Sequence, residues 1–153
     1  MRIFIDTNIL ISALLNSRGT VFSAFCRAVA KPNTGVVCTQ NIEELRRIFN
    51  RKFPDKVPLM ESFLNQAALS LEIIDIPDSP SSEEAKIRDS NDQLIMRAAI
   101  AAGVDVLLTG DKDFLEAGIT SPAIMSPADF VAWISVKDFT TVQNGFVHQK
   151  IVC

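Results

Sequence analysis

Five acidic residues lie where short apolar runs give way to helix-patterned stretches, and their types and spacing suit phosphodiester chemistry. They occur in the segments IFIDTN, TQNIEEL, RDSNDQLI and LLTGDKDFL, and they are Asp6, Glu44, Asp92, Asp111 and Asp113. Carboxylates that converge without positive partners repel one another unless cations occupy the site. Oxygen ligands of this kind suit Mg2+ or Mn2+, ions that activate water for attack on a phosphodiester. The acids are therefore candidates for one metal-binding, catalytic pocket.

Helix starts and turns also attract acids for structural reasons, so each candidate has a second interpretation. Asp6 fits a helix cap, and Asp111 and Asp113 fit turn residues. Capping alone does not explain why Asp6 comes directly after the first predicted strand while two further acids, in TGDKD, follow the fourth. For Asp6 and Asp111 we therefore favour the pocket.

Glu44 and Asp92 have stronger structural alternatives. Asn41 with Glu44 fits a capping box, and Ser90 with Gln93 fits another, which leaves Asp92 as a first-turn acid favoured by the helix dipole. For these two acids both interpretations stay open on the residues alone.

The elements that must position the acids alternate along the chain. Short β-branched runs predict strands at residues 2–5, 35–38, 72–76, 104–108 and 123–125. Amphipathic stretches predict helices at residues 8–15, 21–30, 40–53, 59–71 and 92–102, and another from about residue 127. Such alternation predicts an α/β fold with a parallel sheet covered on both faces. Because ligands bind outside the carboxyl ends of the strands in such a sheet, we expect the five acids to share one rim.

One domain is expected, because 153 residues with 48% hydrophobic content suffice for one substantial core and are short for two. Its predicted range is 1–136, and residues 137–153 form a tail that does not continue the alternation. The Pro- and Ser-rich segment at residues 77–90 is a loop too short to be a domain linker.

Charge and cysteine content limit the partners and the compartment. The net charge of -3 gives no global attraction to nucleic acid, so a polyanion needs a local basic patch and cations over the acids. Three scattered cysteines and one histidine argue against a zinc site, a disulfide framework or a catalytic triad. Because the chain shows neither a signal peptide nor a membrane-spanning run, we expect it in the cytoplasm with no membrane anchor.

A local basic patch is available between residues 46 and 56, and its members are Arg46, Arg47, Arg51, Lys52 and Lys56. The predicted helix that carries the first four also carries Glu44, so these four are candidates for binding an RNA backbone beside the acids. A solvated helix face is the equally weighted alternative.

At these residues the sequence resembles the PIN-domain family of metal-dependent ribonucleases, and within it the VapC-like toxins. The matching segments are IFIDTNILISALL, TQNIEELRRIF, RDSNDQLIMRAA, LLTGDKDFL and SPADFVAWI, which come in the expected order and span residues 1 to about 135. The resemblance implies a three-layer α/β/α sandwich and hydrolysis of single-stranded RNA or exposed RNA loops.

The resemblance also implies roles for individual residues. Direct metal ligation is expected of Asp6, Asp92 and Asp111, while Glu44 and Asp113 complete the pocket directly or through water. Thr7, Asn8 and Thr109 are expected to hold the carboxylates or to contact the scissile phosphate. Glu43, four residues before Arg47, is expected in a surface ion pair.

The family pattern implies a cognate antitoxin that binds beside the site, although nothing in the composition shows that partner. The tail departs from the pattern. A contact in a homodimer, an added extension and a disordered end all stay open for it.

Three other functions also fit part of this pattern. A receiver-like signalling domain also gathers acids around Mg2+, but the acid of the middle predicted strand, Asp75, lies inside that strand and not at its end. A non-catalytic binding protein is disfavoured because all four key acids are present. A structure-specific DNA nuclease is the nearest rival, since the same metal chemistry cuts either backbone and no reader of the RNA 2′-hydroxyl is recognisable.

Overall fold

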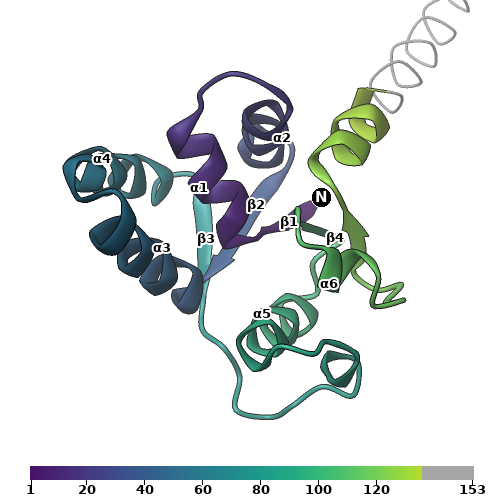
Figure 1. Cartoon of the computed structure of the whole chain (residues 1–153). Coiled ribbons are helices and arrows are strands. Elements are labelled where there is room, and N and C mark those ends of the chain that lie inside the picture. The colour runs from purple at the N-terminus through teal and green to yellow at the C-terminus, as the bar shows by residue number, and fades with distance from the viewer. Residues whose placement is uncertain (136–153) are drawn as a thin grey trace, which may run out of the picture.

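A parallel sheet of five strands forms the centre of the computed structural model, which describes residues 1–135 (Figure 1). The strands are β1 (Arg2–Ile5), β2 (Thr34–Cys38), β3 (Leu71–Ile74), β4 (Val106–Leu108) and β5 (Ala123–Met125). Every strand pair is parallel, and the order across the sheet is β3-β2-β1-β4-β5. The predicted domain boundary at residue 136 and the tail at residues 137–153 lie outside the described residues.

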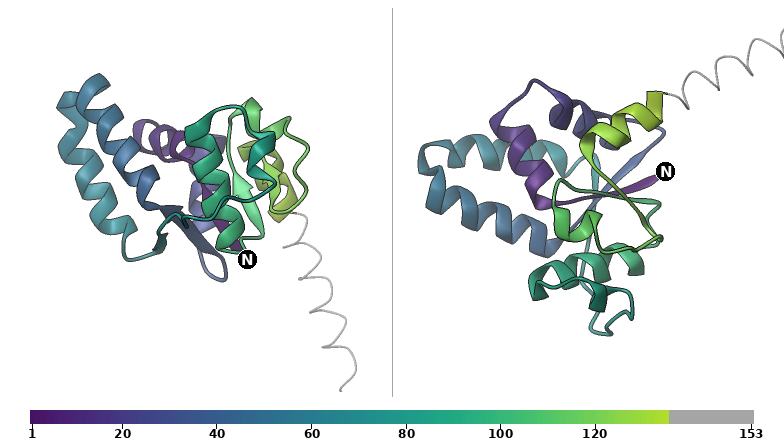
Figure 2. Two further views of the ribbon diagram at one scale, coloured as in Figure 1. Left: turned by 90° about the horizontal axis from the view of Figure 1, so that it is seen from below. Right: turned by 45° about the vertical axis from the view of Figure 1, so that its right-hand side comes forward.

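Helices connect the strands and cover both faces of the sheet (Figure 2). They are α1 (Thr7–Leu15), α2 (Thr20–Val29), α3 (Thr39–Lys52), α4 (Val57–Ala67), α5 (Ser90–Ala101) and α6 (Lys112–Leu115), with 3-10 turns η1 (Pro54–Lys56) and η2 (Glu84–Lys86) and a further helix at residues 127–135. Over residues 1–135 no single helix has the length and apolarity to cross a membrane, and only α1 with α2, bent by 116°, meets that criterion as a pair.

Alternation along the strands decides which side chain packs under which helix. Ile3 and Ile5 of β1 face the core that α1 to α4 and the helix at residues 127–135 cover, whereas Phe4 faces the core beneath α5 and α6. All three side chains are fully buried. Because both faces carry buried apolar residues, both must be covered, and the predicted three-layer α/β/α sandwich is confirmed.

Some predicted boundaries are wrong. The fourth strand begins at Val106 and not at Val104, because the Val104 N–H donates to the Ala99 carbonyl at 3.3 Å and closes the end of α5. Gly103 makes this closure possible with a φ of 60°, a left-handed conformation that glycine adopts without strain. The third strand ends at Ile74 and not at residue 76, and a short helix, α6, follows Asp111 where no helix was predicted.

The strand order reverses between β1 and β4, and this reversal determines where a site can form. The chain moves outward from β1 through β2 to β3, then returns to place β4 on the other side of β1. At such a reversal the connections leave the sheet in opposite directions, and a crevice opens at the carboxyl ends of the strands. The segments that follow β1 and β4 therefore border the crevice directly.

Candidate active site

Four of the five predicted acids reach the carboxyl edge of the sheet from four different connections. Asp6 follows β1, and Asp111 comes shortly after β4. Glu44 lies in the second turn of α3, the helix that follows β2, and Asp92 lies in the first turn of α5. The Asp6 N–H donates to the Leu108 carbonyl at 3.1 Å and so continues the ladder between β1 and β4 to the point where the acids begin.

Asp6 is buried, with 7% of its surface exposed, and both of its carboxylate oxygens accept hydrogen bonds. Oδ1 accepts from the Thr7 N–H at 2.7 Å and caps α1. Oδ2 accepts from the Asn8 amide at 2.7 Å and from the Thr109 hydroxyl at 2.6 Å. Asn8 and Thr109 therefore lie where they hold this carboxylate, whereas Thr7 contacts it through the backbone.

Asn8 and Thr109 also join the two connections on either side of the strand reversal. The Asn8 side-chain oxygen accepts from the Gly110 N–H at 3.2 Å, and the Thr109 hydroxyl accepts from the Asp111 N–H at 3.0 Å. Asp111 in turn caps α6, accepting from the Asp113 N–H at 2.8 Å. Asp6 and Asp111 are thus held in one hydrogen-bonded network across β1 and β4.

The buried side-chain amide of Asn41 holds the start of α3, although the sequence suggested this residue only as a helix cap. The Asn41 side-chain oxygen accepts from the Cys38 N–H at 2.9 Å, and its amide donates to the Thr7 hydroxyl at 3.0 Å. Asn41 is fully buried, and it joins the start of α3 to the start of α1. The predicted capping box of Asn41 with Glu44 is wrong, because Asn41 pairs with Cys38 and leaves Glu44 without a capping role.

The second predicted capping box is also wrong. Asp89, one residue before Ser90, caps α5 and accepts from the Asn91 N–H at 2.8 Å and the Asp92 N–H at 3.3 Å. The Gln93 amide donates instead to the Ile87 carbonyl at 2.8 Å. Asp6 and Asp111 therefore cap helices, although the sequence disfavoured capping as their sole role, whereas Asp92 lies in the first turn of α5 without capping it.

The loop that leads into α5 is held against that helix by a largely buried ion pair. Arg97 of α5 binds both carboxylate oxygens of Glu84, at 2.6 and 2.9 Å, and also donates to the Asp78 carbonyl at 3.3 Å. Glu84 further accepts from the Ser81 N–H at 3.0 Å. The Pro- and Ser-rich segment is therefore packed on α5, and its far end brings Asp89 to the rim.

Electrostatics show that the acids lie close enough to act on one another. Burial raises the pKa of Asp6 from 3.8 to about 6, although hydrogen bonds from Thr109 and Thr7 lower it. The negative charges of Glu44 and Asp111 contribute to this rise in pKa. A carboxylate in this position favours a proton or a cation.

Asp92 shows the same effect more strongly. Its pKa is raised from 3.8 to about 7, first by burial and then by the charges of Asp6, Asp89, Asp111 and Glu44, in that order of importance. Asp89 therefore belongs to the cluster, although the sequence did not single it out. Its signal was the D-x-x-D spacing in RDSND, which places one Asp at the cap and the next in the first turn.

Asp113 stands apart from the other predicted acids. It is exposed, and its charge is not among those that shift the pKa of Asp6 or Asp92. Within residues 1–135, no three Asp, Glu, His or Cys side chains converge closely enough to hold one ion between them. The carboxylates repel one another but do not form a closed ligand cage.

Few cations balance the acids. In the described part of the chain the one ion pair to any of the predicted acids joins Arg47 to Glu44, at 3.7 Å. Glu43 has no such pair, so the expected Glu43–Arg47 interaction is wrong, because Arg47 lies over the residue three positions earlier. The predicted basic patch is split, since Arg46 binds both carboxylate oxygens of Glu61 on α4 at 2.9 and 3.1 Å.

Arg51 and Lys52 are exposed at the far end of α3. At 1.5 Å per residue, Lys52 lies roughly 12 Å along the helix axis from Glu44. Arg47 is therefore the predicted basic residue that borders the acidic cluster, and the other two lie further along the same helix.

Comparisons with known proteins agree with this architecture. A family model described as the PIN domain matches residues 2–113. VapBC2 from Rickettsia felis was solved bound to a DNA fragment from its promoter, and it is 22% identical to this chain with a TM-score of 0.63. The match covers 82% of this chain and 98% of that chain. DNA-bound VapBC from Salmonella typhimurium is 16% identical with a TM-score of 0.61, covering 83% and 98%. A toxin-antitoxin complex from Klebsiella pneumoniae is 22% identical with a TM-score of 0.56, covering 81% and 96%. A search of the curated proteins found no match.

Proposed function

The chain belongs to the PIN-domain family, and from that premise we propose that it is a divalent-metal-dependent endoribonuclease and the toxin of a toxin-antitoxin pair. PIN domains are nucleases, which hydrolyse phosphodiester bonds. The observation that carries the proposal is the mutual repulsion of Asp6, Glu44, Asp92 and Asp111 at the strand reversal. Such an arrangement is stabilised when a cation binds.

The side chains suit Mg2+ or Mn2+, because every candidate ligand offers oxygen. Asp6, Asp92 and Asp111 are the proposed direct ligands, which would draw together around the ion, with Glu44 and Asp113 completing the pocket directly or through water. Mg2+ keeps several of its waters in protein sites, so part of its coordination shell needs no protein ligand. When bound, such an ion supplies Lewis acidity and positive charge at the phosphodiester.

The chain's own residues position and orient the reacting groups. Asn8 and Thr109 hold the Asp6 carboxylate through its Oδ2, and the Thr7 N–H holds Oδ1. Glu44 accepts no hydrogen bond among the described residues, and its loose pairing with Arg47 leaves it free to orient water near the scissile phosphate. Arg47, and beyond it Arg51 and Lys52, supply positive charge to the RNA backbone. Arg46 contributes less, because Glu61 already binds its guanidinium.

One cleavage assay tests the enzymatic part. Labelled single-stranded RNA and DNA are incubated with purified protein in Mg2+ or Mn2+, with chelator and with the Asp6→Asn and Asp92→Asn variants as controls. We expect cutting of RNA that chelator and either substitution abolish. Cutting that survives both substitutions would reject the assignment, and cutting of DNA alone would retain the metal pocket and reject RNA as the substrate.

The toxin role is supported by the similarity in fold to VapBC and other toxin-antitoxin complexes. We propose that a small antitoxin covers the acidic site in the cytoplasm and inserts a basic side chain among the acids. Co-expression with the product of an adjacent small reading frame, followed by light scattering, measures both this complex and any homodimer. An adjacent product that neither binds nor inhibits the nuclease would argue against the toxin role.

A further inference from the structure

A polar pocket of about 410 Å³ borders the acidic cluster and shares Glu44 and Arg47 with the site proposed above. We propose that it binds one base of a single-stranded RNA next to the scissile phosphate and so selects where the chain is cut. This inference rests on the proposed nuclease function. It adds a specificity site formed by Gln40, Asn91, Ile76 and Arg47.

The position of the pocket places it beside the reacting phosphate. Glu44 lines the pocket, and its charge also acts on Asp6 and Asp92. Asn91, which also lines the pocket, directly precedes Asp92 in the first turn of α5. A nucleotide whose phosphate reaches the acids therefore has its neighbour within reach of this pocket. The volume lies within the range of small-ligand pockets.

Two side-chain amides give the pocket groups that can read a base. The Gln40 amide nitrogen donates to the Asn91 backbone carbonyl at 3.2 Å, which fixes the orientation of the Gln40 side chain. The Gln40 side-chain oxygen has no hydrogen-bond partner among residues 1–135. The same holds for both polar atoms of the Asn91 side-chain amide. Amides offer a donor and an acceptor side by side, which matches the edges of unpaired bases.

The remaining walls suit the faces and the backbone of a nucleotide. Ile76, in the segment after β3, gives the pocket an apolar surface on which a base can lie. Arg47 has 70% of its side chain exposed, and its pairing with Glu44 is loose at 3.7 Å. A planar guanidinium in this position can stack on a base or bind a phosphate.

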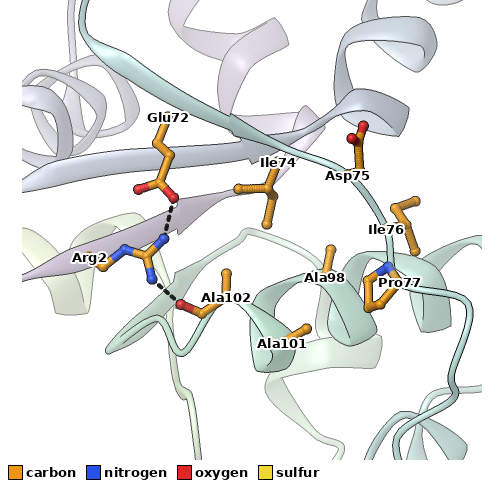
Figure 3. Close-up of a pocket in the computed structure, with 9 residues that line it drawn as sticks. All are labelled: Arg2, Glu72, Ile74, Asp75, Ile76, Pro77, Ala98, Ala101 and Ala102. Atoms are coloured by element: carbon orange, nitrogen blue, oxygen red, sulfur yellow. Dashed lines mark hydrogen bonds and ion pairs between the residues drawn. The ribbon is translucent and has the colours of Figure 1, made fainter.

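A second hollow, which Ile76 also lines, lacks these properties (Figure 3). Its walls are mainly Ile74, Pro77 and the alanines of α5, and Arg2 closes one end by binding Glu72 and the Ala102 carbonyl. None of the acids that repel one another lines it. The polar pocket is therefore the one that adjoins the chemistry.

Sequencing the cut ends of a randomised single-stranded RNA pool tests the proposal. The full chain is compared with Gln40→Ala, Asn91→Ala and the double variant, and Gln66→Ala is the matched control, because it removes an exposed amide on α4 that lines neither the pocket nor the cluster. Asn91 is exposed, so its substitution should leave folding intact. We expect a base preference at one position next to the cut, reduced roughly tenfold in the double variant and unchanged in the control.

The outcomes separate this inference from the function on which it rests. If the wild-type protein cuts no RNA, the nuclease assignment fails and the base pocket fails with it. If the wild type cuts and the double variant keeps the same preference, only the base pocket is overturned. A double variant that binds the antitoxin more weakly but keeps its base preference would also overturn it, because a protein side chain would then be the occupant.

Discussion

The two oxygens of Asp6 serve different elements, and this limits what a substitution at that residue can reveal. One oxygen caps α1, and the other accepts from Asn8 and Thr109 on the two sides of the strand reversal. Removing the carboxylate therefore disturbs folding and chemistry together. Asp92 is the cleaner probe, because its side chain accepts no hydrogen bond within residues 1–135 while its pKa is raised to about 7.

We predict that Asp92→Asn abolishes cleavage and, in metal-free protein at pH 8, raises the free energy of unfolding by about 1 kcal/mol after allowance for solvent screening. A carboxyl whose pKa is higher in the folded state holds its proton more tightly there than in the unfolded chain. Its destabilising effect is therefore absent below pH 3.8, grows as the pH rises, and is complete above about pH 7. The neutral asparagine removes the charge and hence this pH dependence.

Urea unfolding between pH 4 and pH 8 measures the effect, with Asp55→Asn in η1 as the control because Asp55 is exposed and its charge is not among those that shift the pKa of Asp92. Wild-type stability should fall more steeply over this range than that of Asp92→Asn. Equal slopes for the two proteins would show that Asp92 is not under strong repulsion.

Asp111 and Asp113 should differ in their effects although only one residue separates them. Asp111 acts on both Asp6 and Asp92, whereas Asp113 acts on neither. We predict that Asp111→Asn lowers kcat/KM for RNA by roughly 100-fold or more and Asp113→Asn by less than about 10-fold. Asparagine retains the cap of α6, so both variants should melt close to the wild type. Equal losses in a steady-state cleavage assay would assign Asp113 a direct role.

At the scale of elements, the strands and long helices were predictable, because the spacing of apolar residues and the runs of β-branched residues reflect local burial. The residues that cap the helices were not predictable from these patterns. In RDSND both Asp89 and Ser90 are good N-caps, and the choice depends on where the loop packed by Glu84 and Arg97 delivers the chain. Asn41 could not be assigned its role either, since its partner Thr7 lies 34 residues earlier.

We predict that Asn41→Ala destabilises the protein by about 1–3 kcal/mol, because it leaves the buried Cys38 N–H without its acceptor. The substitution also cuts the link between α3 and α1, which sets the position of Glu44 relative to Asp6. More Mg2+ should then be needed for half-maximal cleavage. The control is Asn50→Ala, an exposed amide on the same helix, which should change stability by less than about 0.5 kcal/mol.

Urea unfolding and the Mg2+ dependence of cleavage measure the two effects of Asn41→Ala separately. A stability loss with an unchanged Mg2+ requirement would show that Asn41 supports the fold without positioning the acids. A change in both would support the positioning role.

At the scale of the whole molecule, the site is placed by topology more than by any one motif. The parallel sheet brings four connections to one rim, next to the reversal of strand order, and acids from each connection meet there. A chain with a net charge of -3 and such a rim repels a polyanion. Cation binding should therefore stabilise the fold and admit the substrate at the same time.

We predict that Mg2+ raises the melting temperature of the wild-type protein at pH 8 and has a much smaller effect at pH 5, where protons compete at Asp6 and Asp92. Mass action gives about 2.7 kcal/mol of stabilisation when the ion is present at 100 times its Kd. Melting curves in MgCl2 should therefore shift upward more than curves in NaCl of equal ionic strength, and Asp92→Asn should lose most of the difference. An equal shift in both salts at both pH values would mean that the acids bind no specific ion, and it would remove the basis for metal-dependent cleavage.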